Sequence, residues 1–201
     1  MAAATAKNWL YKATGEIEYL LCITYQDPFL KKYRAAFENL PVKIVYHMVG
    51  NMVKQLNHAA KLATGDLFVN VSDDFDCPKD WDKLLIDALK GKQDFVVKTN
   101  DGVEADGIHS ANIIALPIMD RVYYNRFKYI YHPAYGHFFG DEELSNVGDK
   151  LKRKITLPIT FEHIHYVAGK AKIDATNVKN NKHFDQDKKT FERRKAKNFE
   201  G

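Results

Sequence analysis

The sequence has few cysteines and no long apolar run, and both absences limit the kind of protein it encodes. Two cysteines among 201 residues, Cys22 and Cys77, cannot form the disulfide framework of a small secreted domain. No apolar run approaches the roughly 20 residues that a bilayer-spanning helix needs, and the N-terminus lacks the basic and apolar segments of a secretory signal. Internal repeats and low-complexity segments are also absent. These features predict a cytoplasmic protein without a membrane span.

The chain has the length and composition of one globular domain. At 201 residues, with 45% hydrophobic and 28% charged residues, it is long enough to bury a single core. Its formal net charge of +4 comes from the C-terminus, because the segment from Lys170 onward carries 10 Lys or Arg and 5 Asp or Glu. Such a tail is typical of a solvated segment or of a polyanion-binding one. We expect one domain over residues 1–168, and a basic segment over residues 169–201 that packs on it or extends from it.

Helix-like and strand-like segments alternate along the first half of the chain. Gly15 and Gly65 stand where helices would end, and Asp27 stands where one would begin. The expected helices cover residues 6–14, 28–37, 51–63 and 78–88, and the expected strands cover residues 16–24, 42–47, 67–71 and 95–99. This alternation predicts parallel strands joined by right-handed crossovers. In such sheets, ligands bind beyond the carboxyl ends of the strands.

The pattern changes in the second half of the chain. Pro117 is expected to start a short helix, and the aromatic stretch over residues 128–139 is expected to form strands and a pocket wall. In that wall, Tyr131, His132 and Tyr135 either stack on the apolar face of a sugar or belong to the core. The remaining expected elements are a polar loop over residues 100–107, a helix over residues 141–152, and strands over residues 155–157 and 160–166.

The stretch GDLFVNVSDDFDCPKDW ends an apolar strand in three carboxylates, Asp73, Asp74 and Asp76. Carboxylates this close together repel one another and need a cation, amide donors or open water. Mg²⁺ and Mn²⁺ bind one or two protein carboxylates together with phosphate and water, so strand-end aspartates would suit them. The alternative use of a short acidic triplet is in turns and caps, and Asp76 would then cap the helix that Pro78 opens.

Two later motifs carry further candidate residues. In FEHIHY, His163 and His165 fall on one face of a strand by period-two alternation, where they either bind a metal or form a polar edge. In GDEEL, acidic residues stand at the start of a helix, where the helix dipole stabilises negative charge. Asp141 and Glu143 of this motif also follow the aromatic stretch, which suits a sugar or a base.

In their order and spacing, these residues resemble the family 2 nucleotide-sugar glycosyltransferases, which have the GT-A fold. The likeness runs from about Lys7 to Phe199 and comprises the helix with Asn57, the strand ending in VSDDFDCPKDW, the loop with PIMDR, then GDEEL and HIHY. It implies an α/β fold with a Rossmann-like, mostly parallel central sheet flanked by helices, and a mixed C-terminal part. The strand that normally opens this fold before the first helix is missing from the sequence.

The resemblance also implies roles for particular residues. The implied ligands of Mn²⁺ or Mg²⁺ are Asp73, Asp74, and His163 or His165. The implied nucleotide-binding residues are Asp27, Asn57 and Asp73. Asp141 would be the base that takes a proton from an acceptor hydroxyl as it attacks the anomeric carbon, so that the configuration inverts. The donor implied is a nucleotide-diphosphate sugar, in the first place a UDP-sugar.

The sequence leaves open the acceptor, which can be a glycan, a lipid, a protein or a nucleic acid, and also the oligomeric state. The alternative to an enzyme is a catalytically degenerate domain of the same kind that binds a nucleotide, a glycan or a polyanion. The missing opening strand and the basic FERRKAKNF tail motivate this alternative. A nucleic-acid binder is less favoured, because Asp185 and Asp187 interrupt the basic tail and the sequence has no base-reading motif.

Overall fold

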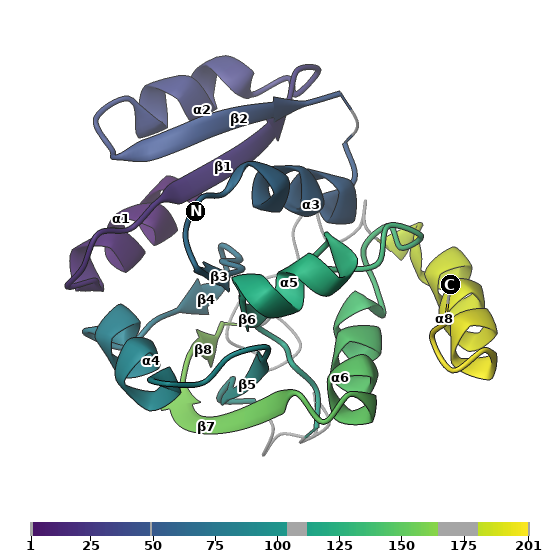
Figure 1. Ribbon diagram of the computed structural model, residues 1–201. Helices are drawn as coiled ribbons and strands as arrows, with labels where there is room; N and C mark the ends of the chain where they lie inside the picture. Colours follow the sequence, from purple (N-terminus) through teal and green to yellow (C-terminus); the bar gives the residue numbers. More distant parts are fainter. Residues whose placement is uncertain (1, 49, 104–111, 165–180, 201) are drawn as a thin grey trace.

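The computed structural model describes residues 2–48, 50–103, 112–164 and 181–200, and its first third alternates helices with two parallel strands (Figure 1). The elements of this part are α1 (Ala2–Lys12), β1 (Tyr19–Thr24), α2 (Leu30–Phe37), β2 (Val42–His47) and α3 (Met52–Leu62). β1 and β2 pair in register from Tyr19↔Val42 to Thr24↔His47. Parallel neighbours need a crossover connection, and α2 supplies it.

A mixed sheet of four strands forms the centre of the chain. In sheet order, its strands are β3 (Leu67–Val69), β6 (Ile118–Asp120), β5 (Val96–Asn100) and β7 (Lys154–Thr160). β6 runs antiparallel to both of its neighbours, whereas β5 and β7 are parallel.

Helices cover both faces of this sheet and create two hydrophobic cores. They are α4 (Trp81–Leu89), α5 (Arg121–Phe127), α6 (Gly140–Lys150) and α8 (Phe184–Ala196), together with α1 and α3. Val96 of β5 belongs to the core under α3, α5, α6 and α8, whereas the next residue, Val97, belongs to the core under α1 and α4. Successive strand residues point to opposite faces, so β5 contributes to both cores.

A short antiparallel strand pair brings the acidic cluster next to residues 162–163. β4 (Phe75–Asp76) pairs with β8 (Glu162–His163), and Phe75 lies opposite His163. The Trp9 indole of α1 donates a hydrogen bond to Phe75 O at 3.0 Å and its ring stacks on Phe161, so α1 covers this pair.

The structure confirms an α/β chain and most of the expected elements, but the sheet arrangement differs from the expectation. The described strands form several sheets with both parallel and antiparallel pairs, and they do not form one clear Rossmann-like central sheet. The antiparallel strand β6 is the main reason, because it lies between β3 and β5. Its residues, Ile118–Asp120, are all buried.

Two local predictions are wrong. Pro117 does not start a helix: its carbonyl accepts a hydrogen bond from Asn70 N, β6 follows, and α5 begins only after Asp120, whose side chain caps it through Tyr123 N. Residues 128–139 form no strand either. Side chains from other elements hydrogen-bond the backbone of this segment instead, as described below.

Among the residues that the structure describes, no helix combines the length and apolar character that a membrane crossing requires.

Candidate active site

Asp74 and His163 are in direct contact, although they lie 89 positions apart in the chain. Asp74 Oδ2 is 3.1 Å from His163 Nε2. The ring of Phe75 stacks on the His163 imidazole with 4.2 Å between ring centroids, and Ile164 N donates to Asp74 O at 2.7 Å. The pairing of β4 with β8 therefore holds the two side chains together.

The carboxylate of Asp74 favours its ionised form. Burial by itself disfavours the charge, but hydrogen bonds from His163 and Ser72 lower the pKa of Asp74 below its ordinary value. Asp74 Oδ1 is buried and receives no hydrogen bond from any residue in the described part of the chain. A buried carboxylate oxygen without a donor costs free energy, and a cation that binds there would remove this cost.

Asp74 and His163 offer a carboxylate and an imidazole, which are donor types that divalent cations use. The 3.1 Å contact is a hydrogen bond between Asp74 Oδ2 and His163 Nε2, whereas the oxygen without a donor among the described residues is Oδ1. Carboxylates suit Mg²⁺ and Mn²⁺, and imidazole suits transition metals. Within the described ranges, no three or more His, Cys, Asp or Glu side chains form a group that could hold a metal ion. A cation here would therefore take its remaining ligands from phosphate and water.

Asp73 and Asp27, both predicted to bind the nucleotide, lie near α2. Burial, followed by the charges of these two aspartates, raises the pKa of Tyr33 in α2. Burial and the charge of Asp73 also raise the pKa of Tyr19 to about 12. Asp73 is exposed, and Asp27 lies in the loop after β1, where its Oδ1 accepts a hydrogen bond from Phe29 N at 2.8 Å.

Asp76 interacts with α1. Its Oδ1 accepts hydrogen bonds from the Asn8 amide and from Lys12 Nζ, the latter at 2.7 Å. Burial opposes the charge of Asp76, but these hydrogen bonds lower its pKa. Its interpretation as the cap of α4 is wrong, because the N-cap residue is Asp80, whose φ is 56° and whose side chain makes no capping hydrogen bond.

Asp141 lies in the first turn of α6, and Tyr131 connects this turn to the end of β3. Burial and then the charge of Asp141 raise the pKa of the buried Tyr131, whereas a hydrogen bond with the Asn70 side chain opposes this shift. Asn70 directly follows β3, so the two elements meet at one tyrosine. A Cβ atom on Gly140 would lie 2.9 Å from the Tyr131 ring, so this close packing requires glycine.

Asn57 stabilises the segment that precedes α6. Its Nδ2 donates to Tyr131 O at 2.7 Å, and its Oδ1 accepts from Ile130 N at 2.9 Å and from Tyr131 N at 3.3 Å. These bonds satisfy backbone groups in a segment without regular structure. The sequence did not indicate this structural role, and nucleotide binding by Asn57 stays a prediction.

A buried ion pair between α6 and α8 was missed by the sequence analysis. Glu143 and Arg194 are 4% and 8% exposed, and two hydrogen bonds of 2.8 and 2.9 Å join the guanidinium to the carboxylate. The Tyr135 hydroxyl donates to the same carboxylate at 2.7 Å. Glu143 is therefore part of a structural network, and it is not available as a ligand for a sugar.

A buried carboxylate in α8, Asp187, was also missed. Asp187 is 2% exposed and accepts hydrogen bonds from three successive backbone amides, those of Gly136, His137 and Phe138, at 2.8, 2.8 and 2.9 Å. One signal for this face exists in the sequence. The buried residues of α8 recur at the i, i+3, i+4 and i+7 spacing of a core-facing helix, namely Asp187, Thr190, Phe191 and Arg194.

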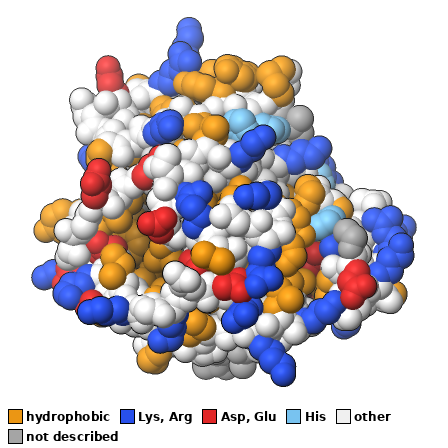
Figure 2. Space-filling view, viewed as in Figure 1, with side chains coloured by type: hydrophobic (Ala, Val, Ile, Leu, Met, Phe, Trp, Pro, Cys, Tyr) orange, Lys and Arg blue, Asp and Glu red, His pale blue; other side chains and the backbone are white. Residues whose placement is uncertain are grey.

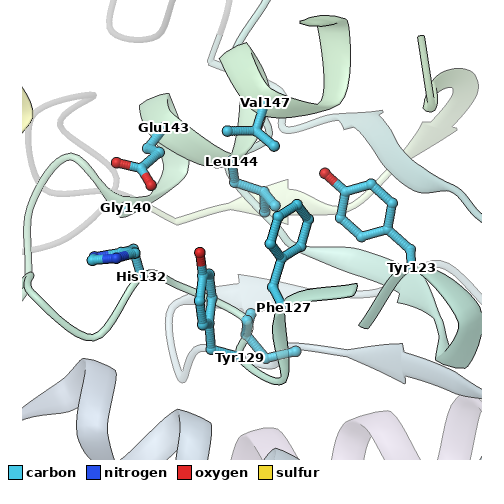
Figure 3. Close-up of a pocket in the computed structure, with 9 residues that line it drawn as sticks. Tyr123, Phe127, Tyr129, His132, Gly140, Glu143, Leu144 and Val147 are labelled. Carbon is cyan, nitrogen blue, oxygen red and sulfur yellow. The ribbon is translucent and has the colours of Figure 1, made fainter. Parts of the chain in front are cut away.

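A small cavity lies beside this network (Figure 3). Its volume of about 20 Å³ has room for about one water molecule, so the cavity is too small for a sugar. In Figure 3, the side chains of Tyr129 and His132 point towards Glu143. From the expected aromatic wall, Tyr129 and His132 line this cavity, whereas Tyr131 and Tyr135 are buried in the core.

The second candidate histidine, His165, lies outside the described residues. Among the predicted site residues, the structure thus shows a contact between Asp74 and His163, and Asp73 precedes Asp74 in the chain. Asp141 interacts with Tyr131, which is hydrogen-bonded to Asn70 after β3. No protein-family model matches the chain, and no curated protein matches its sequence.

Proposed function

We propose that this protein is a metal-dependent, inverting glycosyltransferase that transfers a sugar from a nucleotide-diphosphate sugar, in the first place a UDP-sugar, to an acceptor hydroxyl. The contact between Asp74 and His163 carries the proposal, because it combines an ionised carboxylate, a buried oxygen without a donor and an imidazole. The proposal includes a GT-A-like fold, which the parallel pairs β1–β2 and β5–β7 support.

Asp74 and His163 would hold Mn²⁺ or Mg²⁺, and Asp73 and Asp27 would bind the nucleotide. When bound, the ion neutralises the negative charge that develops on the departing diphosphate.

Asp141 would act as the base. The positive end of the α6 dipole favours the ionised carboxylate that a base needs. As the acceptor oxygen forms its bond to the anomeric carbon, the bond from that carbon to the diphosphate oxygen breaks, and the hydroxyl proton passes to Asp141. The acceptor attacks from the face opposite the diphosphate, so the configuration at the anomeric carbon inverts.

The surface of α8 favours a second candidate, a degenerate domain that binds a polyanion. Figure 2 shows Lys and Arg side chains gathered on the outer side of the region where α8 lies in Figure 1. The exposed basic residues of this helix are Lys188, Lys189, Arg193 and Lys195. A protein of this kind would bind heparin or nucleic acid, with an affinity that falls as the salt concentration rises.

A binding experiment separates the two candidates. We expect UDP and UDP-sugars to raise the melting temperature of the protein only when Mn²⁺ is present, because the ion joins the diphosphate to Asp74 and His163. The Asp74→Asn variant should weaken Mn²⁺-dependent UDP binding at least tenfold, to roughly the extent expected when a metal site is disturbed. Isothermal titration calorimetry measures this affinity.

Asp185→Asn is the matched control, because it removes an exposed carboxylate from α8. Its UDP affinity should equal that of the wild type. Stabilisation by heparin or nucleic acid, without any Mn²⁺-dependent effect of UDP, would support the polyanion-binding domain and reject the transferase.

A further inference from the structure

Helix α8 holds the chain segment that leads into α6. The Asp187 carboxylate accepts hydrogen bonds from the backbone amides of residues 136–138. Seven positions later in the same helix, Arg194 forms an ion pair with Glu143 in the first turn of α6. Two successive turns of α8 therefore bind the backbone that precedes α6 and one side chain of α6 itself. Asp141 lies between these two anchors in the sequence.

The Asp187 contact is both buried and geometrically demanding. Gly136 N donates to Oδ1, whereas His137 N and Phe138 N donate to Oδ2. Three charge-assisted hydrogen bonds to one buried carboxylate restrict the path of this segment, which has no regular secondary structure of its own. A Cβ atom on Gly136 would lie 2.6 Å from the His183 ring, so the backbone is also packed closely against the start of α8.

The segment held in this way lies within electrostatic reach of the candidate metal site. Burial and then the charge of His183 lower the pKa of His137, whereas the charges of Asp187 and Asp74 oppose this shift. The charges of Asp187 in α8 and of Asp74, directly before β4, therefore both act on His137.

We propose that Asp187 and Arg194 are positioning residues, through which α8 sets the location of Asp141 relative to Asp74 and His163. This inference rests on the proposed function, since it concerns the distance between the base and the donor site. Neither residue touches the reacting atoms. Displacing a catalytic group by about 1 Å can reduce the rate about 100-fold, so the anchors control turnover without contributing to donor affinity.

The Asp187→Asn substitution tests this role with little change in size. An amide has a single acceptor oxygen, and its NH₂ group would face at least one of the three backbone N–H groups, as a donor against a donor. The segment must then shift or leave an amide unsatisfied. Asp185→Asn is the matched control, because Asp185 lies in the same first turn of α8 but is exposed.

The experiment measures two quantities for each variant of the full chain: the affinity for UDP with Mn²⁺ and the rate of UDP release from a UDP-sugar. We expect Asp187→Asn to lower kcat at least tenfold while UDP affinity changes less than about twofold, and Asp185→Asn to change neither. Arg194→Lys keeps the charge near Glu143 but loses the paired hydrogen bonds, and it provides the same test should Asp187→Asn fail to fold.

A kcat for Asp187→Asn equal to that of Asp185→Asn would overturn the positioning role and leave the proposed function intact. Equal losses of kcat and UDP affinity would also overturn it, because they indicate a general loss of folded protein. A wild-type protein without Mn²⁺-dependent UDP binding would instead refute the proposed function itself, and the inference with it.

Discussion

At the scale of single residues, buried carboxylate oxygens differ in how completely they are hydrogen-bonded. Glu143 and Asp187 are almost fully buried, and both have strong partners: a guanidinium and a hydroxyl for Glu143, and three backbone amides for Asp187. Asp74 differs, since one of its oxygens is buried and accepts no hydrogen bond from the described residues. Partnered buried charges are typical of structure, and an incompletely partnered one is more typical of a functional site.

Replacing Asp141 by Asn separates binding from turnover. The variant should keep the UDP affinity of the wild type, because Asp141 is not among the proposed donor ligands. The rate of sugar transfer should fall about 10²- to 10⁴-fold, the usual contribution of a general base. Calorimetry with UDP and Mn²⁺, together with an assay of UDP release, measures both. Unchanged turnover would remove Asp141 from the mechanism.

Replacing Glu143 by Gln tests the buried ion pair. Arg194 would then be left buried without its countercharge, which costs about 3–5 kcal/mol. For a chain of this length, we expect the melting temperature to fall by roughly 10 °C. Glu142→Gln is the control: burial raises the pKa of Glu142, so its charge is not favoured by the fold. Equal melting temperatures for the two variants would contradict the structural role of Glu143.

At the scale of elements, side chains at helix ends decide how neighbouring elements join. Asp82 of α4 accepts hydrogen bonds from Thr14 N at 2.9 Å and from Gly15 N at 2.6 Å, and so connects α4 to the turn after α1. In the same way, Asp120 caps α5 and accepts hydrogen bonds from Asp94 N and Phe95 N. This second role of Asp120 explains why the helix begins there and not at Pro117.

The Asp82 contact makes stability depend on pH. Burial opposes the charge, but the Thr14 and Gly15 amides lower the pKa of Asp82 below its unfolded value. Its contribution is therefore complete above the ordinary carboxyl pKa of about 4 and is lost as the pH falls through the lower folded-state pKa. We expect the Asp82→Asn substitution to lower the free energy of unfolding by about 1–3 kcal/mol at pH 7, and by less as the pH falls below about 4.

Urea unfolding of the wild type and Asp82→Asn between pH 7 and pH 3 measures this effect. Asp87→Asn is the control on the same helix, since Asp87 is exposed and pairs with Lys83 at the surface. If the free energies of unfolding of the wild type and Asp82→Asn differ by the same amount at every pH, the carboxylate charge is not the cause of the stabilisation.

At the scale of the whole molecule, β5 and β6 join the two cores. Val96 pairs with Met119 in the core beneath α3, α5, α6 and α8, and Val97 pairs with Ile118 in the core beneath α1 and α4. Neither core can lose its packing without exposing one face of the same two strands. The domain is therefore expected to unfold in a single cooperative transition.

Substitutions of Val96 and Val97 test this coupling, because both tryptophans, Trp9 and Trp81, lie in the core that contains Val97 and that α1 and α4 cover. Val96→Ala and Val97→Ala should each lower the free energy of unfolding by about 2 kcal/mol and the melting temperature by roughly 4–8 °C. For both variants, tryptophan fluorescence and far-UV circular dichroism should report the same midpoint. A fluorescence midpoint that Val96→Ala leaves unchanged would show that the cores unfold separately.

The sequence by itself determined those features whose cause lies within one element. The alternation of helices and strands, the bounds of β2 and the helix over Met52–Leu62 follow from local periodicity and end signals, and the structure contains all of them. The resemblance assigned Asp73, Asp74 and either His163 or His165 to one site. The structure places Asp74 in contact with His163, and the metal-binding role of these residues stays a prediction.

Only the tertiary structure decided the partners of groups that are distant in sequence. Asp187 and Arg194 belong to a basic segment that the sequence predicted either to pack on the domain or to extend from it, and they are buried because α8 covers the segment before α6. Likewise, β6 pairs antiparallel with both β3 and β5, and its side chains Met119 and Ile118 enter opposite cores. Local periodicity sets which face of an element is apolar, whereas the packing of the layers sets what that face meets.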